Sequence, residues 1–397
     1  MNSKIKLFLE KHKFFIEPQD KLYISIIEDM KKGLSTGGSD QAMIKAGSAA
    51  IRTIQEGETA IVIDAGGTNF RSCLVKKTAD GIELSDFEKT VMPAIDRELN
   101  KKEFYCAIAN NISRLKDRSD KISFCFSYAM SITEDGDGKI IRFSKEIKAT
   151  EAVGSYLGKE LLSELKIQGW KKIKKINVLN DTTALLLSSF VEKSEKKWGS
   201  HLAYILGTGM NSAYINQGRI IVTECGMFSQ LPQSDFDLTV CNRTTQPKQS
   251  LLEKMCSGAY LGDIATEMVK AATKENLFSP GFIPPRNFGT KDFDSYFAQD
   301  DTSLNSDQLK IKEMISAIIY RSANLTAEAI YAAAICTDKE KGELPLCITC
   351  NGSTFWKTPL LKETVESRLQ ILLQQPFEII KIDDDITKGS FAAAFID

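Results

Sequence analysis

The stretch Thr59-Ala-Ile-Val-Ile-Asp64, Ala65-Gly-Gly-Thr-Asn69, Phe70-Arg-Ser-Cys-Leu-Val75 sets two apolar runs on either side of a Gly-Gly-Thr turn. This pattern is typical of a β-hairpin, and two glycines without a proline let the turn wrap closely around a ligand. A second unit of the same design follows at 202–215, where the turn is Gly207-Thr-Gly-Met-Asn211. Two such hairpins in the two halves of one chain predict a duplicated α/β domain.

Between the hairpins, the apolar run 176–179 precedes Asn180-Asp181 and the start of a helix. An acid at such a junction is an ordinary helix N-cap, because its carboxylate accepts backbone N–H groups of the first turn. At the C-terminal end of a strand, the same carboxylate is also placed to take a proton from a substrate hydroxyl. This stretch alone leaves both interpretations of Asp181 open.

The remaining elements follow from apolar spacing and from turn residues. Residues 4–54 have the spacing of helices, with breaks at Gly33 and at Gly37-Gly38. The Pro-, Gly-, Asp- and Asn-rich segment 279–307 predicts a long surface loop. The rest of the pattern predicts helices over 104–115, 154–165, 251–270, 309–335, 359–373 and 389–396, and strands over 121–130, 344–349 and 377–382.

Length and composition narrow the class of protein. A chain of 397 residues predicts two domains or lobes, and a formal net charge of -1 argues against nucleic acid or an anionic membrane as a partner. Residues 1–15 carry scattered charges rather than the apolar core of a signal peptide, and no apolar run reaches the length of a membrane-spanning helix. Nine scattered cysteines favour a cytoplasmic location, and two histidines disfavour a His triad or a His-rich metal centre.

Phosphate binding is the chemistry that the two hairpins favour. The chain contains no Gly-x-x-x-x-Gly-Lys-Ser/Thr loop. Glycines in the two turns can instead bring backbone N–H groups against phosphate oxygens, with threonine hydroxyls as further donors. Asp64, at a strand end, is suited to hold Mg²⁺ directly or through water, and Arg71 is suited to pair with a phosphate. The donors predicted in this way belong to Gly66, Gly67, Thr68, Gly207, Thr208 and Gly209.

Several segments, in order, resemble one family. Asp64-Ala-Gly-Gly-Thr-Asn-Phe-Arg71 resembles the first phosphate hairpin of the eukaryotic-type hexokinases and glucokinases, which belong to the actin-like ATPase superfamily. Glu253-Lys-Met-Cys-Ser-Gly-Ala-Tyr-Leu-Gly-Asp263 resembles the most specific segment of that family. The likeness covers nearly the whole chain, and its other segments are Asn180-Asp-Thr182, Gly207-Thr-Gly-Met-Asn211, Arg321-Ser-Ala-Asn-Leu325 and Asn351-Gly-Ser353, the last two of which border the adenosine in the family.

The resemblance implies an α/β, two-lobed actin-like ATPase (ribonuclease H-like) fold with a central cleft between the lobes. The small lobe is expected to span residues 58–179 and the large lobe residues 180–384. The N-terminal helices in residues 1–57 are expected to pack on the large lobe. The C-terminal helix, residues 385–397, is expected to return to the small lobe.

The implied activity is ATP-dependent phosphorylation of the 6-hydroxyl of a hexose, with glucose first, Mg²⁺ as the metal and glycolysis as the setting. The partners are then small molecules, the hexose and ATP. Two alternatives stand beside it. One is a kinase for another sugar, such as mannose, fructose or an amino sugar. The other is a sugar sensor that no longer turns over, which the joint presence of Asp64, Thr68, Asp181 and Thr208 disfavours.

The resemblance also assigns roles to individual residues. The catalytic group comprises Asp181, as the base, with Lys145 and Thr208. The residues expected to bind the sugar are Ser127, Ser144, Lys145, Asn180, Asp181, Asn211, Glu224 and Glu253. The residues expected to bind ATP are Asp64, which also serves Mg²⁺, Gly66, Gly67, Thr68, Asn69, Arg71, Gly207, Thr208, Gly209, Gly352 and Ser353.

The chain departs from the family at several places. Ser144 stands where the family has threonine, and Cys241-Asn242 stands where the family has an Asp-Glu pair. Ser127-Tyr128-Ala129 stands where the family has Ser-Phe-Pro, and Glu224-Cys225 lacks the aromatic residue that follows the glutamate in the family. The change at 127–129 predicts a different shape for the loop over the sugar. The departures together are expected to affect sugar specificity and turnover more than the fold.

Overall fold

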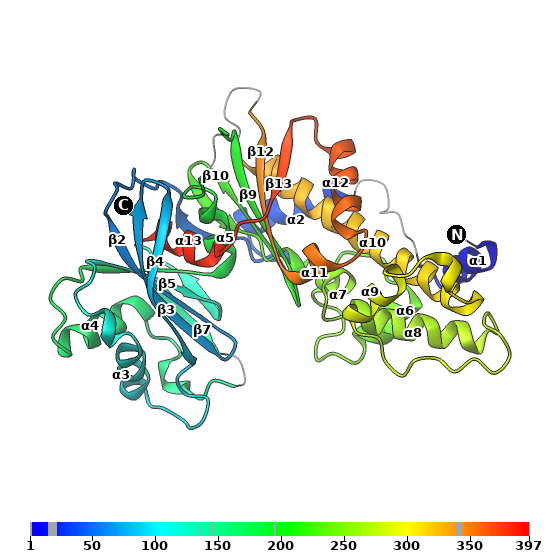
Figure 1. Ribbon diagram of the computed structural model, residues 1–397, viewed down its shortest axis with the longest axis horizontal. Coiled ribbons are helices and arrows are strands. Elements are labelled where there is room, and N and C mark those ends of the chain that lie inside the picture. Colours follow the sequence, from blue (N-terminus) through cyan, green and yellow to red (C-terminus); the bar gives the residue numbers. More distant parts are fainter. Residues whose placement is uncertain are drawn as a thin grey trace.

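The computed structural model describes residues 2–14, 22–133, 135–143, 146–193, 196–338 and 344–396. These residues form two main β-sheets, each covered by helices, with two further helices between the sheets (Figure 1). Among the helices in these ranges, none combines the length and the apolar character that crossing a membrane requires.

The five-stranded small sheet has the order β4-β3-β2-β5-β8. Strands β2 and β3 form the first glycine hairpin and pair from Thr59↔Lys76 to Gly66↔Asn69. Strand β4 extends this antiparallel side, whereas β5 and β8 add in parallel on the other side of β2. The bounds of these strands are β2 Thr59–Gly66, β3 Asn69–Thr78, β4 Gly81–Val91, β5 Lys121–Phe126 and β8 Lys175–Leu179.

The six-stranded large sheet has the order β1-β11-β10-β9-β12-β13. Its last five strands repeat the design of the small sheet: the first strand of the hairpin is central, two antiparallel strands lie on one side, and two parallel strands lie on the other. The predicted duplication of an α/β domain is therefore confirmed in the topology. The bounds are β1 Ile44–Ser48, β9 Ser200–Leu206, β10 Met210–Asn216, β11 Arg219–Val222, β12 Leu346–Asn351 and β13 Phe377–Ile380.

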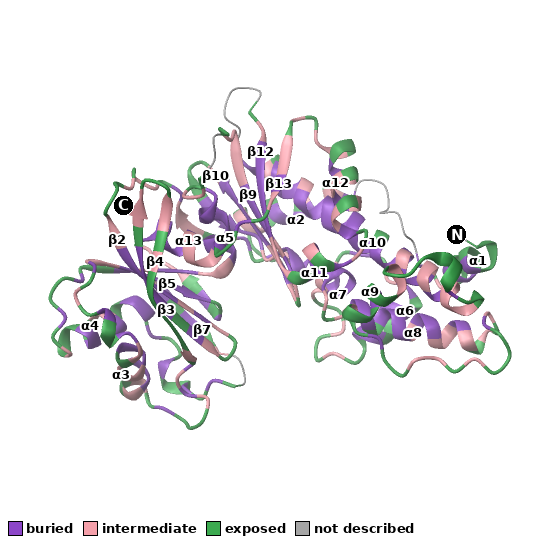
Figure 2. Cartoon of the chain, in the orientation of Figure 1, coloured by how far each residue is buried: buried purple, intermediate pink, exposed green. Residues whose placement is uncertain are grey.

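Helices cover the outer faces of both sheets. The longest, α10, runs from Ser306 to Cys336, begins at an Asn305 N-cap and is buried along most of its length, as the purple ribbon in Figure 2 shows. Its alanine and isoleucine side chains join the largest apolar core, which lies against the large sheet. The helices packed around this core are α1 Ser3–Lys11, α2 Leu22–Ser35, α6 Asp235–Cys241, α7 Leu251–Cys256, α8 Leu261–Lys274, α9 Phe293–Phe297, α11 Ser353–Lys357 and α12 Leu361–Leu372. Those of the small sheet are α3 Lys101–Asn111 and α4 Leu157–Ile167.

Two helices, α5 (Asp181–Ser188) and α13 (Asp385–Ala393), lie between the sheets (Figure 1). The side chains of 184–187 are fully buried, which is expected of a helix with apolar neighbours on all sides. The two helices pack at very short range, because a Cβ at Gly389 would lie 1.6 Å from the carbonyl oxygen of Ala184. Helix α13 also contacts β2 and β5 of the small sheet.

The structure corrects four expectations about single elements. Residues 44–48 form strand β1, paired antiparallel with β11, although apolar spacing predicted helix up to residue 54. The strand predicted over 121–130 ends at Phe126, and β6 (Ala129–Ile132) pairs separately with β7 (Gly138–Arg142). The expected loop 279–307 contains α9. Helix α13 begins at Asp385, the start that the resemblance implied, four residues before the start that apolar spacing predicted. Strands β1 and β6 are set by their pairing with β11 and β7, which local apolar spacing does not reveal.

Candidate active site

Asp181 lies at the junction of β8 and α5, but it is not the cap of that helix. The N-cap is Asn180, whose Oδ1 accepts the N–H of Thr183 at 2.8 Å. The carboxylate of Asp181 accepts the adjacent N–H of Thr182 at 2.7 Å and the Thr182 hydroxyl at 3.2 Å. The N-cap interpretation of Asp181 is therefore wrong. Because Asn180 caps the helix, the carboxylate of Asp181 is available for another role. The side-chain NH₂ group of Asn180 is available to donate a hydrogen bond.

The environment of Asp181 disfavours its charged form. Burial raises the pKa of this carboxyl, the two bonds from Thr182 oppose the rise, and the negative charge of Asp64 adds to it. A carboxylate whose pKa is raised is a better proton acceptor than an ordinary surface aspartate.

Glu224 and Asn211 hold each other across two strand ends of the large sheet. The Asn211 amide donates from Nδ2 to Oε1 of Glu224 at 2.7 Å, and its Oδ1 accepts the backbone N–H of Glu224 at 3.0 Å. Glu224 has a left-handed backbone, with φ of 55°. This conformation costs about 1 kcal/mol for a residue with a Cβ, and such strain gathers at functional sites. The arrangement fixes the direction of the Glu224 carboxylate.

Glu253 reaches the same region from the first turn of α7. Its Oε2 accepts the N–H of Met210 at 3.1 Å, at the start of the second strand of the hairpin. A Cβ at Gly209 would lie 2.8 Å from this oxygen, so glycine is needed here to admit the carboxylate. Burial raises the pKa of Glu253, and the bond from Met210 opposes the rise.

The three acids form one group. Burial is the main cause that raises the pKa of Glu224, the bond from Asn211 lowers it, and the charges of Asp181 and Glu253 raise it further. Half-buried carboxylates with free acceptor positions, next to an amide, match the needs of a ligand with several hydroxyl groups. We refer to Asp181, Glu224 and Glu253 as the acid cluster.

The first glycine hairpin carries an ion pair behind its exposed tip. Arg71 donates from Nη1 to Oδ2 of Asp64 at 2.7 Å, whereas Gly67 and Thr68 are exposed. Ser127 lies against this hairpin, because its N–H donates to the carbonyl of Ala65 at 2.9 Å. A Cβ at Gly66 would lie 3.1 Å from the Cβ of Ser127. A residue expected to bind the sugar therefore adjoins one expected to bind ATP.

The residues near Asp64 fit a magnesium ion that arrives with a nucleotide. Within the described ranges no group of three or more His, Cys, Asp or Glu side chains could hold a metal ion by itself. Mg²⁺ commonly needs only one or two protein carboxylates, because water and substrate phosphates complete its coordination. The Asp64 side chain is 16% exposed, so part of it can be reached from solvent.

The second glycine hairpin is held by the large sheet and its helices. The carbonyl of Gly207 accepts two donors, the N–H of Gly258 at 2.8 Å and the Thr354 hydroxyl at 2.8 Å. Gly352 packs against the start of the same turn: its φ is 113°, and a Cβ there would lie 2.1 Å from the carbonyl oxygen of Leu206. This hairpin is thus fixed from two directions.

A cavity of about 320 Å³ opens beside Gly352 and Ser353. Both residues were predicted to contact ATP, and both line it. The Trp356 indole N–H donates to the carbonyl of Cys350 at 3.0 Å and so holds the ring at the cavity wall. The remaining lining residues are Asn351, Lys357 and residues 381–385.

Asp385 is a residue of this region that the sequence did not single out. It is buried at the first turn of α13, where it accepts the Asn351 amide and the N–H of Ile386, the latter at 2.7 Å. Burial raises its pKa, and the charges of Asp384 and Asp64 add to the rise. Burial is the main cause that raises the pKa of the Cys125 thiol, and the charges of Asp64, Asp181 and Asp385 add to the rise. The only sequence signal for Asp385 was the run of acids at 383–385 before a helix.

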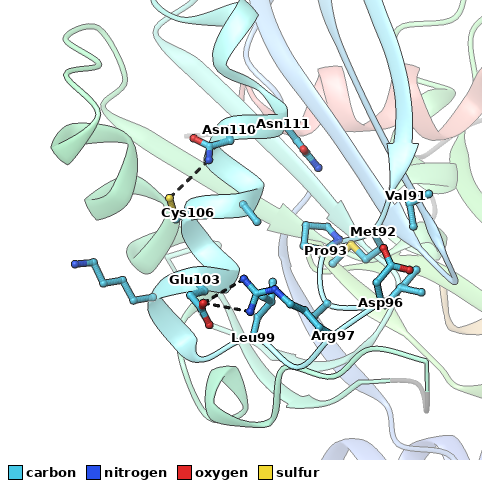
Figure 3. Close-up of a pocket in the computed structure, with 14 residues that line it drawn as sticks. Val91, Met92, Pro93, Asp96, Arg97, Leu99, Glu103, Cys106, Asn110 and Asn111 are labelled. Carbon is cyan, nitrogen blue, oxygen red and sulfur yellow. Dashed lines mark hydrogen bonds and ion pairs between the residues drawn. The ribbon is translucent and has the colours of Figure 1, made fainter.

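Two predicted sugar-binding residues, Ser144 and Lys145, lie outside the described residues. A larger cavity, of about 710 Å³, lies elsewhere on the small sheet, between the segment after β4 and helix α3 (Figure 3). It is edged by the Arg97–Glu103 ion pair at 3.2 Å, and none of its lining residues is a predicted site residue. Arg321, in a segment likened to the adenosine border, is instead buried against Asp237 at 2.7 Å.

Two family models, both described as hexokinase, match residues 4–191 and residues 201–396. This chain belongs to the hexokinase family. Among curated relatives, glucokinase-1 of Kluyveromyces lactis is 25% identical over 87% of this chain and 87% of its own length. Hexokinase-2 of Saccharomyces cerevisiae is 25% identical over 96% of this chain and 90% of its own length. Hexokinase-1 of Rattus norvegicus is 22% identical, and the match covers 92% of this chain but 45% of that hexokinase.

Solved structures place the fold in the same family. A crystal structure of a hexokinase aligns with a TM-score of 0.83 at 21% identity, over 99% of this chain and all of that one. A hexokinase from Schistosoma mansoni in complex with glucose aligns with a TM-score of 0.75 at 18% identity, over 98% of both chains. The predicted two-lobed actin-like ATPase fold is therefore confirmed.

Proposed function

We propose that this chain transfers the γ-phosphoryl group of ATP to the 6-hydroxyl of a hexose, with glucose as the preferred sugar and Mg²⁺ as the metal, in the cytoplasm. The observation that carries this proposal is the position of Asp181, which is released from helix capping and influenced by the charge of Asp64 in the small sheet. Its charge in turn acts on Glu224 of the large sheet. An acid between a phosphate hairpin and a hydroxyl-binding cluster is what phosphoryl transfer to a sugar needs.

Asp181 is proposed to accept the proton of the 6-hydroxyl as the phosphoryl group arrives, a contribution of about 10²–10⁴ in rate. Asn211, Glu224, Glu253 and the amide of Asn180 are proposed to bind the other hydroxyls, since each offers an acceptor or a donor there. Ser127 joins them from the small sheet. The roles of Ser144 and Lys145 stay predictions from the resemblance.

The nucleotide is proposed to lie along the two glycine hairpins, with its adenosine in the cavity beside Gly352 and Ser353. Gly66, Gly67, Thr68 and Asn69 would meet the phosphates from the small sheet, and Gly207, Thr208 and Gly209 from the large sheet. Arg71 would exchange Asp64 for a phosphate oxygen. When bound, Mg²⁺ neutralises charge on the phosphates. Asp64 would hold it directly or through water.

The lobes are proposed to be residues 58–179 and 180–384, with residues 1–57 on the large lobe and 385–397 returning to the small one. The contacts of α13 with β2 and β5 support the last of these assignments. Closure of the lobes would exclude water, which otherwise competes with the sugar as acceptor.

The test is ADP release, coupled to an indicator reaction, across glucose, mannose, fructose, glucosamine and a no-sugar control. We expect glucose to give the highest kcat/KM. A clear preference for another hexose would mean that glucose is not the preferred substrate, and the proposed reaction would stand. No ADP release with any sugar, together with measurable glucose binding by calorimetry, would contradict the kinase and favour a sugar sensor.

A further inference from the structure

The segment Ser127-Tyr128-Ala129 links the sugar side of the site to the first glycine hairpin through one side chain. Tyr128 is buried, and its hydroxyl donates to the carbonyl oxygen of Gly67 at 2.7 Å. These two residues are 61 positions apart in the sequence. Ser127, the preceding residue, is one of the proposed sugar ligands.

The ring of Tyr128 is held firmly by its neighbours. Its centroid lies 4.7 Å from that of Phe126 and 5.6 Å from that of Phe143. Its contacts with the Phe126 and Phe143 rings leave the Tyr128 ring little freedom, so its hydroxyl stays directed at the Gly67 carbonyl oxygen. Burial raises the pKa of Tyr128 to about 12, with the charges of Glu146 and Asp64 adding to the rise. The hydroxyl therefore keeps its proton near neutral pH and acts as a donor.

A bond to the Gly67 carbonyl has a consequence for Thr68. The peptide unit is planar and trans, so the Gly67 C=O and the Thr68 N–H point in opposite directions. Because the Tyr128 hydroxyl holds the Gly67 carbonyl oxygen on one side, the Thr68 N–H points to the other side. The bond into the carbonyl oxygen also polarises the peptide and makes the Thr68 N–H a stronger donor. Gly67, with φ of 59° and open space around it, would otherwise leave this peptide free to turn.

We propose that Tyr128 is a positioning residue that couples the sugar loop to the ATP hairpin. Because Phe126 and Phe143 already hold the Tyr128 ring, a sugar bound at the adjacent Ser127 acts through a side chain that is in place, and the Tyr128 hydroxyl keeps the Gly67–Thr68 peptide with its N–H toward a phosphate oxygen. This inference rests on the proposed function for the identity of the two ligands. The phenylalanine that the resemblance implies for the family at this position has no hydroxyl with which to make this bond.

The experiment compares Tyr128→Phe with the wild-type protein and with a matched control, Tyr105→Phe. The Tyr105 hydroxyl is also buried on the small sheet and bonds Ser155 Oγ at 2.6 Å, away from both hairpins. For Tyr128→Phe we expect the KM for ATP to rise about fivefold to tenfold, the usual effect of losing one hydrogen bond. The KM for glucose should stay within about twofold, and Tyr105→Phe should change neither value.

A second measurement separates this inference from the proposed function. Binding of a non-hydrolysable ATP analogue is measured by calorimetry with and without saturating glucose. In the wild-type protein glucose should tighten analogue binding, and in Tyr128→Phe most of that gain should be lost. Equal coupling and an equal KM for ATP in the two proteins would overturn the role of Tyr128, as would the same change in Tyr105→Phe. Absence of turnover in the wild-type protein would overturn only the kinase, because the binding comparison still tests the coupling.

Discussion

The two glycine hairpins occupy the same place in the five-strand pattern that the two sheets share, but they are secured differently. In the second hairpin the Gly207 carbonyl accepts two donors, Gly258 N–H and the Thr354 hydroxyl. In the first, the described residues provide one donor to the Gly67 carbonyl, the hydroxyl of Tyr128. The first hairpin carries charge instead, in Asp64 and Arg71. The duplicated topology thus supports one hairpin whose turn carbonyl accepts two donors and one whose turn carbonyl is held by a single side chain.

The largest expected effect comes from replacing Asp181, the proposed base. Asp181→Asn should lower kcat by about 10²–10⁴-fold, because the amide cannot take the proton of the sugar hydroxyl. Glucose binding, measured by calorimetry, should be retained, since the amide still offers an oxygen acceptor. Near-normal turnover by this variant would contradict the assignment of the base.

Two glycine substitutions compare how tightly the hairpins are packed: Gly352, which lies against the second hairpin, and Gly67, which lies in the turn of the first. Gly352→Ala should lower the free energy of unfolding by about 3 kcal/mol or more, because φ is 113° and the new Cβ meets Leu206 O at 2.1 Å. Gly67→Ala should cost about 1 kcal/mol, since a Cβ there meets nothing within 4 Å and only the left-handed backbone is strained. Urea unfolding of both variants measures the difference. Equal costs would remove the contrast between a rigid and an open hairpin.

The acid cluster beside the second hairpin should be a source of instability. The folded-state pKa of Glu224 is raised, so its ionised form is disfavoured in the folded protein. That cost is absent below the ordinary glutamate pKa and is complete above the folded-state value. Glu224→Gln keeps an acceptor for Asn211 and should raise the melting temperature by about 2 °C at pH 7.

The same Glu224→Gln variant should show no gain in melting temperature near pH 4, where the wild-type carboxyl is largely protonated in both states. Thermal unfolding followed by circular dichroism at the two pH values provides the measurement. A gain of equal size at both would point to packing rather than charge.

The smallest effect on the KM for ATP is expected at the Gly207 carbonyl, which accepts two donors and can lose one of them. Thr354→Val removes one of the two bonds to the Gly207 carbonyl and leaves that of Gly258. The KM for ATP should rise about twofold, less than in Tyr128→Phe, because the remaining donor still orients the peptide. Steady-state kinetics with ATP varied compares the two variants. A larger rise in the KM for ATP in Thr354→Val than in Tyr128→Phe would contradict the proposed difference between the two hairpins.

The family and the fold were predictable from the sequence because short segments with fixed chemistry carry them. A Gly-Gly-Thr turn between apolar strands and the segment 253–263 keep their meaning whatever surrounds them. The topology bears out the duplication that the two turns predicted. Strand β1 was missed, because its structure comes from pairing with β11, about 175 residues later.

The finer features of the site depend on distances that spacing does not encode. That Asn180 rather than Asp181 caps α5 depends on the backbone angles of a single junction. The bond from Tyr128 to Gly67 depends on how two loops meet, and the burial of Asp385 on how α13 seats against Asn351. Each of these is a matter of a few ångströms between segments far apart in the chain.

The contact of Gly389 with Ala184 has a mechanical consequence. Because α5 and α13 touch backbone to backbone, no side chain separates them at that point. Any side chain at residue 389 would have to push the two helices apart, and would thereby disturb the place where α13 joins α5 to strands β2 and β5 of the small sheet.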